Sequence, residues 1–454
     1  MDSPALLPPR ITPSAKPLSG LAFITTFVRN PIEVVPRAAY EEDFVPVARG
    51  RRIWITSPAL VKAVLLDERD KFCKRTQIRL LGPLLGRGIL TSEGAEWRWQ
   101  RQAASPMFRP QELAAYVPAF VRAAEDCAAR WLREPEGTVH RVDTDMTRTT
   151  FEVIAGTLLR SSDESLAPTI RRSVDALAQA AGWDLLYASL DLPAWLPHPG
   201  MVSSVRAMRS LRARVAAVLR ERRAAEAEAA DLTQRLIAAR DPETGASMSD
   251  ERLVDNVLTF YLAGHETTAK ALTWTLFLLA RYPQWSAALE GEIERVVGNG
   301  PVTAGHVEAL VLTQQVIQEA MRLYPPVPIM SRQALADVRI DGREIKAGTS
   351  LLMPIYAIHR HARRWKDPDA FVPERFAPGN ESSIARYQYM PFGAGPRVCI
   401  GRAFAAMESA AILATLLQRV RLGPVEGADP VPVARVTLLP GGGLKLRVTR
   451  RQEL

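Results

Sequence analysis

Hydrophobic residues recur at helical spacing along most of the chain. Residues 202–240 are rich in Ala, Leu, Arg and Glu, which predicts exposed amphipathic helices, and the turn-forming residues 241–247 end this stretch. A long helix is predicted over about 250–280, because its first turn is acidic and Pro283 limits its far end. These patterns favour a mainly helical protein.

Two further helices are predicted in the second half of the chain. One covers residues 311–324 and stops before the pair Pro325-Pro326. The other covers residues 403–420 and is apolar on nearly every side. A helix without a polar face has no side to turn toward water, so we expect this last helix to be buried.

Short strands are predicted among these helices. Residues 338–345 predict a β-hairpin that turns at an Asp-Gly pair, and residues 436–448 predict a second hairpin. We therefore expect a mainly α fold with small β-sheets (α+β). The chain shows no internal repeat and no linker. We expect an extended, proline-rich leader over residues 1–20 and a single domain over 21–454.

Composition and charge narrow the class of protein. With 47% hydrophobic and 24% charged residues, the chain has a globular composition. Its net charge of +9 is spread along the sequence, which favours a basic docking face for an acidic partner over nucleic-acid binding. Three cysteines cannot form a disulfide framework, so we expect a reducing, cytoplasmic compartment. We expect no transmembrane anchor, because no apolar run is long enough.

An acid stands inside the long predicted helix. The segment FYLAGHETTAKAL, residues 260–272, places Glu266 among small and apolar residues. A zinc-protease pattern, H-E-x-x-H, is excluded because Ala269 occupies the position of the second histidine. The acid is followed by Thr267, whose hydroxyl can bond to the carbonyl of Ala263 one turn earlier.

The segment PFGAGPRVCIGRAFA, residues 391–405, contains the strongest chemical signal. Three glycines surround Cys399, and glycine permits tight turns and a close approach of the backbone to a flat ligand. A cysteine at a helix N-terminus is favoured as a thiolate. Arg397 could pair with a carboxylate of the ligand. The alternative for Cys399 alone is a buried structural cysteine.

This segment resembles the heme-ligand loop of the cytochrome P450 family, F-x-x-G-x-R-x-C-x-G. Four more segments are similar to motifs of that family, in the same order along the chain. They are W-R-W-Q-R (residues 97–101), A-G-H-E-T-T (263–268), E-A-M-R (319–322) and P-E-R-F (373–376). The resemblance covers nearly the whole chain and implies the P450 fold, with a long helix on the distal side of the heme and a cysteine loop before a buried last helix.

The resemblance also implies a cofactor, heme b, with its iron bound by the thiolate of Cys399. Arginines and an indole N–H would hold the two heme propionates. The implied cofactor-binding residues are Trp97, Arg101, Ala263, Gly264, Arg332, Phe392, Arg397, Cys399 and Gly401. Glu319, Arg322 and Arg375 would form a buried ion network that fixes the heme loop, where an isolated Glu–Arg pair would suggest only a surface salt bridge.

The activity implied by the resemblance is a monooxygenase, in which one oxygen atom of O2 enters an organic substrate. Glu266 and Thr267 would be the catalytic pair that relays protons during oxygen activation, and Gly264 would leave room for oxygen. Two alternatives stay open: a heme-thiolate peroxygenase, dehydratase or isomerase that needs no external electrons, and a heme-binding sensor or electron carrier. The Glu266–Thr267 pair disfavours both.

Electrons are expected from a separate ferredoxin or flavodoxin with its reductase, because only a short stretch follows Cys399. Arg98 and Arg109 are expected to face solvent or this partner. His265 is expected to pack or to contact solvent, and His359 and His361 are expected in a structural turn. Cys73 and Cys127 are expected to be inert.

The substrate is expected to be apolar, such as a terpenoid, a steroid, a fatty acid or an aromatic polyketide. By position in the family, substrate contacts fall in residues 75–90, 178–205, 256–267, 327–330 and 437–443. Their apolar residues predict a pocket, although each leucine could equally belong to the core. The candidate pocket residues are Leu84, Leu85, Ala263, Val327, Ile329 and Leu439.

Overall fold

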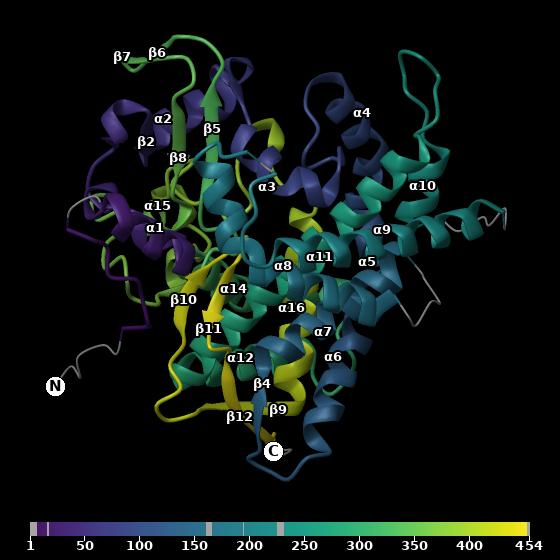
Figure 1. Ribbon diagram of the computed structural model, residues 1–454. Helices are drawn as coiled ribbons and strands as arrows, with labels where there is room; N and C mark the ends of the chain where they lie inside the picture. Colours follow the sequence, from purple (N-terminus) through teal and green to yellow (C-terminus); the bar gives the residue numbers. More distant parts are fainter. Residues whose placement is uncertain (1–6, 16–17, 160–165, 194, 225–230, 452–454) are drawn as a thin grey trace.

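The computed structural model describes residues 7–15, 18–159, 166–193, 195–224 and 231–451. Helices make up most of it, and small sheets lie along one side (Figure 1). The α-helices are α1 (Gly20–Arg29), α2 (Pro58–Lys62), α3 (Arg75–Leu85), α4 (Gly94–Ala104), α5 (Pro110–Ala114), α6 (Val117–Leu132), α7 (Val142–Ile154), α8 (Leu166–Ser189), α9 (Met201–Ala224), α10 (Leu232–Ala238), α11 (Asp250–Arg281), α12 (Pro283–Val296), α13 (Ala304–Ala309), α14 (Val311–Leu323), α15 (Ile355–Ile358) and α16 (Arg402–Arg419).

The strands form four small sheets in the described part of the chain. Their bounds are β1 (Phe44–Val47), β2 (Arg52–Ile55), β3 (Phe72–Cys73), β4 (Val139–Arg141), β5 (Met330–Ala334), β6 (Val338–Ile340), β7 (Arg343–Ile345), β8 (Ser350–Met353), β9 (Val420–Pro424), β10 (Val431–Ala434), β11 (Leu438–Gly441) and β12 (Lys445–Arg450). The largest has the order β1-β2-β8-β5-β3, and a three-stranded sheet has the order β4-β12-β9.

The predicted long helix is confirmed as α11, which runs through the middle of the molecule (Figure 1). Its start is fixed by Ser249, whose side chain accepts a hydrogen bond from the N–H of Arg252, and by two acidic residues in the first turn. It ends at Arg281, just before Pro283 starts α12. Because residues next to each end of α11 determine where it starts and stops, the predicted helix bounds agree with the observed ones.

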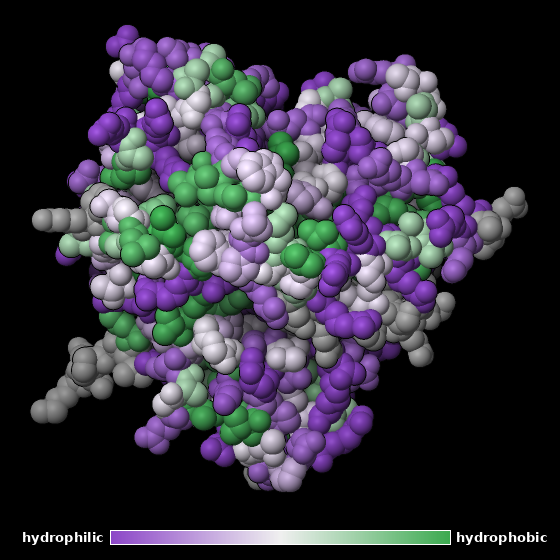
Figure 2. Space-filling model, viewed as in Figure 1, coloured by the Kyte–Doolittle hydropathy of each residue, from purple (hydrophilic) through white to green (hydrophobic). Residues whose placement is uncertain are grey.

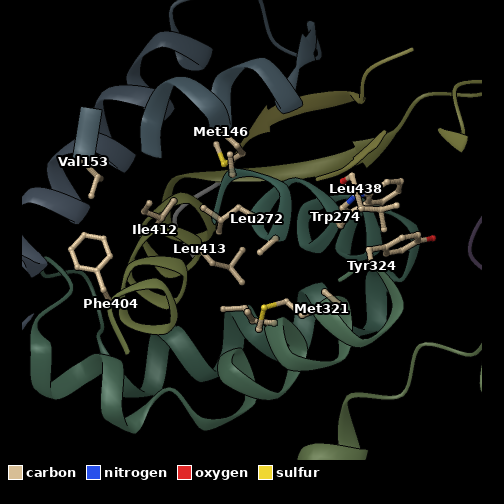
Figure 3. Packing of buried hydrophobic residues seen from close by; sticks show 14 of the residues in the cluster. Met146, Val153, Leu272, Trp274, Met321, Tyr324, Phe404, Ile412, Leu413 and Leu438 are labelled. Carbon is tan, nitrogen blue, oxygen red and sulfur yellow. Dashed lines mark hydrogen bonds between the residues drawn. The ribbon is translucent and has the colours of Figure 1, made fainter. Parts of the chain in front are cut away.

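The core lies where α7, α11, α14 and α16 meet (Figure 3). Trp274 of α11 stacks on Tyr324 with ring centroids 3.9 Å apart, and its indole N–H donates to the carbonyl of Leu438 at 3.0 Å. Ile412 and Leu413 of α16 are completely buried. The prediction of a buried last helix is confirmed, and this helix holds the segment after Cys399 in place.

The predicted hairpin over residues 338–345 is confirmed as β6 and β7, which pair antiparallel. Asp341 and Gly342 between them have φ values of 50° and 73°, as a two-residue hairpin turn requires.

The second predicted hairpin, over residues 436–448, is wrong. β11 pairs with β10, whereas β12 lies between β4 and β9 in a different sheet. Leu444 and Leu446 are buried, and Gly442 and Gly443 have φ values of 78° and 83°. These glycines therefore carry the chain from one sheet to the next, because burial of the leucines favours distant partners over local pairing.

The predicted helices over residues 202–240 are confirmed as α9 and α10, with residues 225–230 outside the described part. The helix over 311–324 is confirmed as α14. Of the predicted leader, residues 1–6 and 16–17 lie outside the described part, and Ile11 is buried. The division of the chain at residue 20 stays a prediction. In the described part, no helix is long and apolar enough to cross a membrane.

Candidate active site

A cavity of about 1180 Å³ lies between α11 and the loop that carries Cys399. Apolar side chains from α3, α8 and α11 supply much of its wall. The predicted pocket residues line it: Leu84, Leu85, Ala263, Val327, Ile329 and Leu439. The predicted cofactor-contacting residues line it as well: Trp97, Arg101, Ala263, Gly264, Arg332, Phe392, Arg397, Cys399 and Gly401. Residues predicted from separate segments therefore meet around one space.

The cavity extends to α1 near the surface. Phe23 and Phe27 of this helix line the cavity, while Leu21 of the same helix is 75% exposed. Figure 2 shows hydrophobic residues on the face that includes α1, among many hydrophilic ones. The end of the cavity at α1 is therefore apolar.

The loop before α16 holds Cys399 in a fixed orientation. The N–H of Cys399 donates to the carbonyl of Phe392 at 3.0 Å. Gly395 has a φ of 71°, and a Cβ there would lie 2.3 Å from the carbonyl oxygen of Leu65. Only glycine fits this close approach. The loop thereby presents the sulfur of Cys399 to the cavity, where the side chain is exposed.

Different groups around Cys399 shift the pKa of its thiol in opposite directions. The protein around the thiol raises its pKa, whereas the N–H of Gly401 and the charge of Arg101 lower it. The net shift is upward, so the helix N-terminus alone does not produce the thiolate that the sequence suggested. A coordinating metal ion removes the proton from a thiol outright, and the site needs that contribution.

Four cations gather on one side of the cavity: Lys74, Arg101, Arg332 and Arg397. Arg332 and Arg397 both have a pKa lowered to about 10, mainly by burial and with repulsion from neighbouring cations acting on Arg397. Lys74 has a pKa lowered to about 7 by burial and by the charges of both arginines. Arg397 lies over the ring of Trp97 at 3.8 Å, and its Nη1 has no hydrogen-bond partner among the described residues. The charge of Glu93, which is exposed and lies outside the cavity wall, offsets part of this positive charge. The remaining buried positive charge favours anionic groups in the cavity.

Across the cavity, α11 presents Glu266 and Thr267. The hydroxyl of Thr267 donates to the carbonyl of Ala263 at 2.8 Å, which confirms the bond expected from the sequence. A carboxylate oxygen of Glu266 accepts a hydrogen bond from the hydroxyl of Thr437 at 2.8 Å. Thr437, which lies just before β11, therefore orients the acid from the opposite wall.

Gly264 lines the cavity beside these residues, but the structure gives it a packing role that the sequence did not show. A Cβ at Gly264 would lie 2.8 Å from Cδ1 of Ile154 at the end of α7. The glycine thus lets α11 approach α7 closely, in addition to leaving space on the cavity side.

Behind the Cys399 loop, Glu319, Arg322 and Arg375 form the expected ion network. Both carboxylate oxygens of Glu319 accept from Arg322, at 2.6 and 2.7 Å, and both side chains are fully buried. Glu319 also accepts from Nε of Arg375 at 3.4 Å and from the N–H of Val372 at 2.9 Å. Every oxygen of this buried carboxylate is satisfied.

His359 connects this network to the Cys399 loop. Its carbonyl accepts a hydrogen bond from Arg322 at 2.9 Å, and its Nε2 accepts from the N–H of Met390 at 2.9 Å. Burial and the charge of Arg322 lower the pKa of His359 to about 3, so the ring is neutral. A rigid connection therefore runs from α14 to the residues just before Phe392.

The histidines, cysteines and arginines that were given no part in the chemistry lie as follows; the inertness of Cys127 and of the half-buried Cys73 stays a prediction. His265 is buried and packs edge-on against Phe151, with ring centroids 5.8 Å apart. His359 and His361 lie in a buried turn after α15. Burial raises the pKa of Cys127 to about 12, which keeps this thiol protonated. Arg98 and Arg109 are exposed.

The comparisons with known proteins agree with this geometry. Residues 47–446 match the model of the family "Cytochrome P450". The chain is 31% identical to pentalenene oxygenase of Streptomyces avermitilis, over 97% of both chains. It is 33% identical to cyclooctat-9-en-7-ol 5-monooxygenase of Streptomyces melanosporofaciens, over 91% of this chain and 90% of the other. The chain belongs to the cytochrome P450 family.

The crystal structure of cytochrome P450DA heme domain matches 98% of both chains with a TM-score of 0.80 and 28% identity. The fold is therefore that of a cytochrome P450, and the protein is a monooxygenase that uses O2, an organic substrate and electrons from a redox partner. Its cofactor is heme with thiolate-ligated iron.

The residues of this P450 fit that cofactor. The Nη1 of Arg397 has no hydrogen-bond partner among the described residues, and the exposed Glu93 is the acid whose charge acts on Lys74, Arg332 and Arg397 together. Heme carries two propionates that would add negative charge beside these cations. The exposed sulfur of Cys399 opens on the same cavity.

Three residues of the site were missed in the sequence. Lys74 belongs to the cation cluster, Thr437 binds Glu266, and Glu408 of α16 is completely buried behind Thr268. Lys74 and Thr437 lie in or next to predicted substrate segments, which was the only signal for them. Glu408 had a stronger signal, because it is an acid in a helix that was predicted to be buried.

Proposed function

We propose that this P450 inserts oxygen into a terpenoid substrate. The observation that carries the proposal is the apolar wall of the cavity, which faces Cys399 and the Glu266–Thr267 pair. An apolar wall favours a hydrocarbon-like molecule, because burial of apolar surface supplies the binding energy. The names of three relatives support the terpenoid class: cyclooctatin synthase, cyclooctat-9-en-7-ol 5-monooxygenase and pentalenene oxygenase.

Each residue around the cavity has a proposed role toward heme. Cys399 is the thiolate ligand, which supplies electron density to the iron. The cavity-lining residues Ala263, Gly264, Phe392 and Gly401 would pack against the heme. Trp97, Arg101, Arg332 and Arg397 hold the propionates, and we add Lys74 to this set because its charge lies beside those of Arg332 and Arg397. The Glu319–Arg322–Arg375 network retains the heme by fixing the loop.

When bound, heme supplies the oxygen chemistry, and the chain supplies the protons. The carboxylate of Glu266 is held toward the cavity by the hydroxyl of Thr437, and it is the proposed proton carrier. The hydroxyl of Thr267 is held in place by the carbonyl of Ala263, and it is the proposed donor to the reacting oxygen.

The electrons are proposed to come from a ferredoxin or flavodoxin with its reductase. Arg98 and Arg109 are exposed near the Cys399 side of the cavity and could receive an acidic partner. Reversing both charges should slow reduction by the partner, while equal reduction rates would contradict this docking face.

We also propose that the protein is cytoplasmic, which cell fractionation would test. A further proposal is a single domain over residues 21–454 after a leader over residues 1–20, which truncation at residue 20 would test.

The deciding experiment is the difference spectrum of the reduced, carbon monoxide-bound protein, followed by titration with terpenes, steroids and fatty acids. We expect the long-wavelength Soret band of thiolate ligation and the largest spin-state shift with a terpene. A short-wavelength band would contradict ligation by Cys399. A larger shift with a fatty acid would contradict the terpenoid class.

Thr267→Ala should uncouple oxygen consumption from product formation by about tenfold, because the hydroxyl that donates the proton is lost. Product and hydrogen peroxide are measured against the oxygen consumed. Thr275→Ala is the matched control: Thr275 also lies on α11 and bonds back to the carbonyl four residues earlier, that of Ala271, but it is buried and does not line the cavity. Equal coupling in both variants would remove Thr267 from the mechanism.

A further inference from the structure

Lys270 is a lysine buried inside the apolar part of α11. Lys270 is only 8% exposed, and its Nζ donates a hydrogen bond to the hydroxyl of Thr147 in α7 at 3.3 Å. Burial lowers the pKa of Lys270, while the charges of Glu266 and Asp143 act to raise it. A buried ammonium whose hydrogen bond goes to a neutral hydroxyl is unfavourable for folding, so packing does not explain this residue.

Lys270 lies one helical turn after Glu266, on the same face of α11. The charge of Glu266 acts to raise the pKa of Lys270, although no hydrogen bond or ion pair joins the two side chains, which bond to Thr437 and Thr147 instead. His265, the other titratable group on this stretch of α11, is also influenced by both residues, but burial lowers its pKa and its Nδ1 donates to the carbonyl of Tyr261 at 2.6 Å. Lys270 is therefore the cation that faces the proposed proton carrier.

Polar groups continue from Lys270 toward the surface. The hydroxyl of Thr147 donates to the carbonyl of Asp143 at 2.8 Å. The carboxylate of Asp143 accepts from Nε of Arg141 at 3.1 Å and from the N–H of Leu444 at 3.0 Å. The side chain of Arg141 is 52% exposed and that of Asp143 is 15% exposed. Titratable and hydroxyl groups thus lead from solvent, through the α7–α11 contact, to the amine of Lys270, which lies one helical turn from the acid in the cavity.

We propose that Lys270 is a positioning residue that resupplies Glu266 with protons. This inference rests on the proposed role of Glu266. An N–H bond of the ammonium breaks, an O–H bond forms on the carboxylate of Glu266, and the neutral amine takes a proton from water at the Asp143–Thr147 end. The four-carbon stem of lysine lets the amine move between Thr147 and Glu266 without a change in the helix.

Two variants separate proton supply from charge alone. Lys270→Met keeps the length of the side chain and removes the amine. Lys270→Arg keeps the positive charge, but a guanidinium does not release its proton. With a surrogate ferredoxin and reductase, we measure oxygen consumption by the heme-loaded enzyme without added substrate, across pH and in heavy water. Both variants should consume oxygen about tenfold more slowly than wild type. In wild type alone, the rate of oxygen consumption should fall as pH rises, because Lys270 loses its proton.

The outcomes are distinguishable. If wild type lacks the thiolate carbon monoxide band, the proposed function fails before Lys270 is compared. If all three proteins show the band and Lys270→Arg matches wild type, Lys270 acts through charge only and proton supply is wrong. The same holds if Lys270→Met matches wild type in rate, pH profile and isotope effect. Thr147→Val should reproduce part of the Lys270→Met effect, and Thr275→Val, the matched control, should change nothing.

A second measurement does not depend on turnover. Because burial lowers the pKa of Lys270 in the folded state, the unfolded chain binds more protons at pH values between that lowered pKa and the ordinary value of lysine, and wild-type stability rises with pH across that window. Lys270→Met should therefore melt at a higher temperature than wild type at pH 7, and the difference should shrink toward pH 10. A variant less stable than wild type at pH 7 would show that the lysine has a structural role instead.

Discussion

Glu319 and Glu408 are both completely buried, yet their surroundings are opposite. Glu319 accepts hydrogen bonds from two arginines and a backbone N–H. Neither oxygen of Glu408 has a hydrogen-bond partner of good geometry among the described residues. Burial raises the pKa of Glu408 well above its ordinary value, and the nearby Thr268 side chain lowers it only in part. Donors therefore decide the charge of a buried acid: Glu319 is an anion within a network, and Glu408 is a neutral carboxyl.

The two buried acids also differ in where they lie relative to the cavity. The Glu319 network lies behind the Cys399 loop and connects to it through His359. Glu408 lies beside Thr268, which lines the cavity next to Thr267. Satisfied charges thus hold the scaffold, whereas buried groups with few partners, such as Glu408 and Lys270, lie along α11 where protons are needed.

The largest effect is expected from removing the partner of Glu319. Arg322→Leu leaves a buried carboxylate without its main donor, which should lower the free energy of unfolding by about 3–5 kcal/mol and reduce heme content. Chemical denaturation and the heme-to-protein absorbance ratio measure both. Arg343→Leu is the control, because Arg343 pairs with Asp341 at the surface and should change stability by less than about 1 kcal/mol. If both variants lost the same free energy of unfolding, the buried Glu319–Arg322 pair would be no more important for stability than a surface pair.

An intermediate effect is expected at Glu408, with a distinct dependence on pH. Because its pKa is raised in the folded state, the unfolded chain releases this proton first, and stability falls as pH rises above the ordinary Glu value. Glu408→Gln removes this titration. The free energy of unfolding of Glu408→Gln should lie within about 1 kcal/mol of the wild-type value at pH 5. Above pH 5, the variant should become more stable than wild type by about 1 kcal/mol per pH unit. Parallel stability curves for the two proteins would show that Glu408 is charged in the fold.

A similar effect of opposite sign is expected at His359. Its pKa is lowered to about 3 in the folded state, so the unfolded chain takes up the proton first and stability is lost as pH falls below about 6.5, the ordinary value. Urea unfolding at pH 7 and pH 5 should show a loss of about 1–2 kcal/mol from this group. His359→Gln should lose less between these two pH values. An identical loss would assign the acid sensitivity to other groups.

The smallest effect is expected at the edge of the network. Arg375 is 14% exposed and bonds to Glu319 at 3.4 Å, so water can replace part of its contribution. Arg375→Leu should therefore cost about 1 kcal/mol, measured in the same denaturation series as Arg322→Leu. A loss as large as that of Arg322→Leu would mean that Glu319 needs both arginines equally.

Local spacing explains which parts of the site could be predicted. Glu319 and Arg322 lie three residues apart on one helix, so their contact follows from helix geometry. The bond from Thr267 to Ala263 follows in the same way, and the turn at Asp341-Gly342 follows from the φ preferences of its residues. Cys399 was found because glycines around it mark a loop of special geometry.

Contacts between distant segments explain what was missed. Thr437 meets Glu266 across the cavity, and Lys74 joins two arginines from the other end of the chain. The hairpin predicted over residues 436–448 failed for the same reason, because β11 and β12 each pair with a strand other than their neighbour. No local pattern distinguishes these partners from others of similar composition.

The sequence by itself determined the helices, the loop of Cys399 and the acid–threonine pair, because each depends on residues within about one or two turns of one another. The class of cofactor followed from the resemblance of five segments between residues 97 and 405 to motifs of the cytochrome P450 family. Only the tertiary structure decided which buried charges are satisfied. Burial raises the free energy of any charge, and hydrogen-bond partners of the right kind, many of them from other elements, offset it. Glu319 receives donors from Arg322 on its own helix and from Val372 and Arg375 in a distant loop. The ammonium of Lys270 donates to a neutral hydroxyl, that of Thr147, and neither oxygen of Glu408 has a hydrogen-bond partner of good geometry among the described residues.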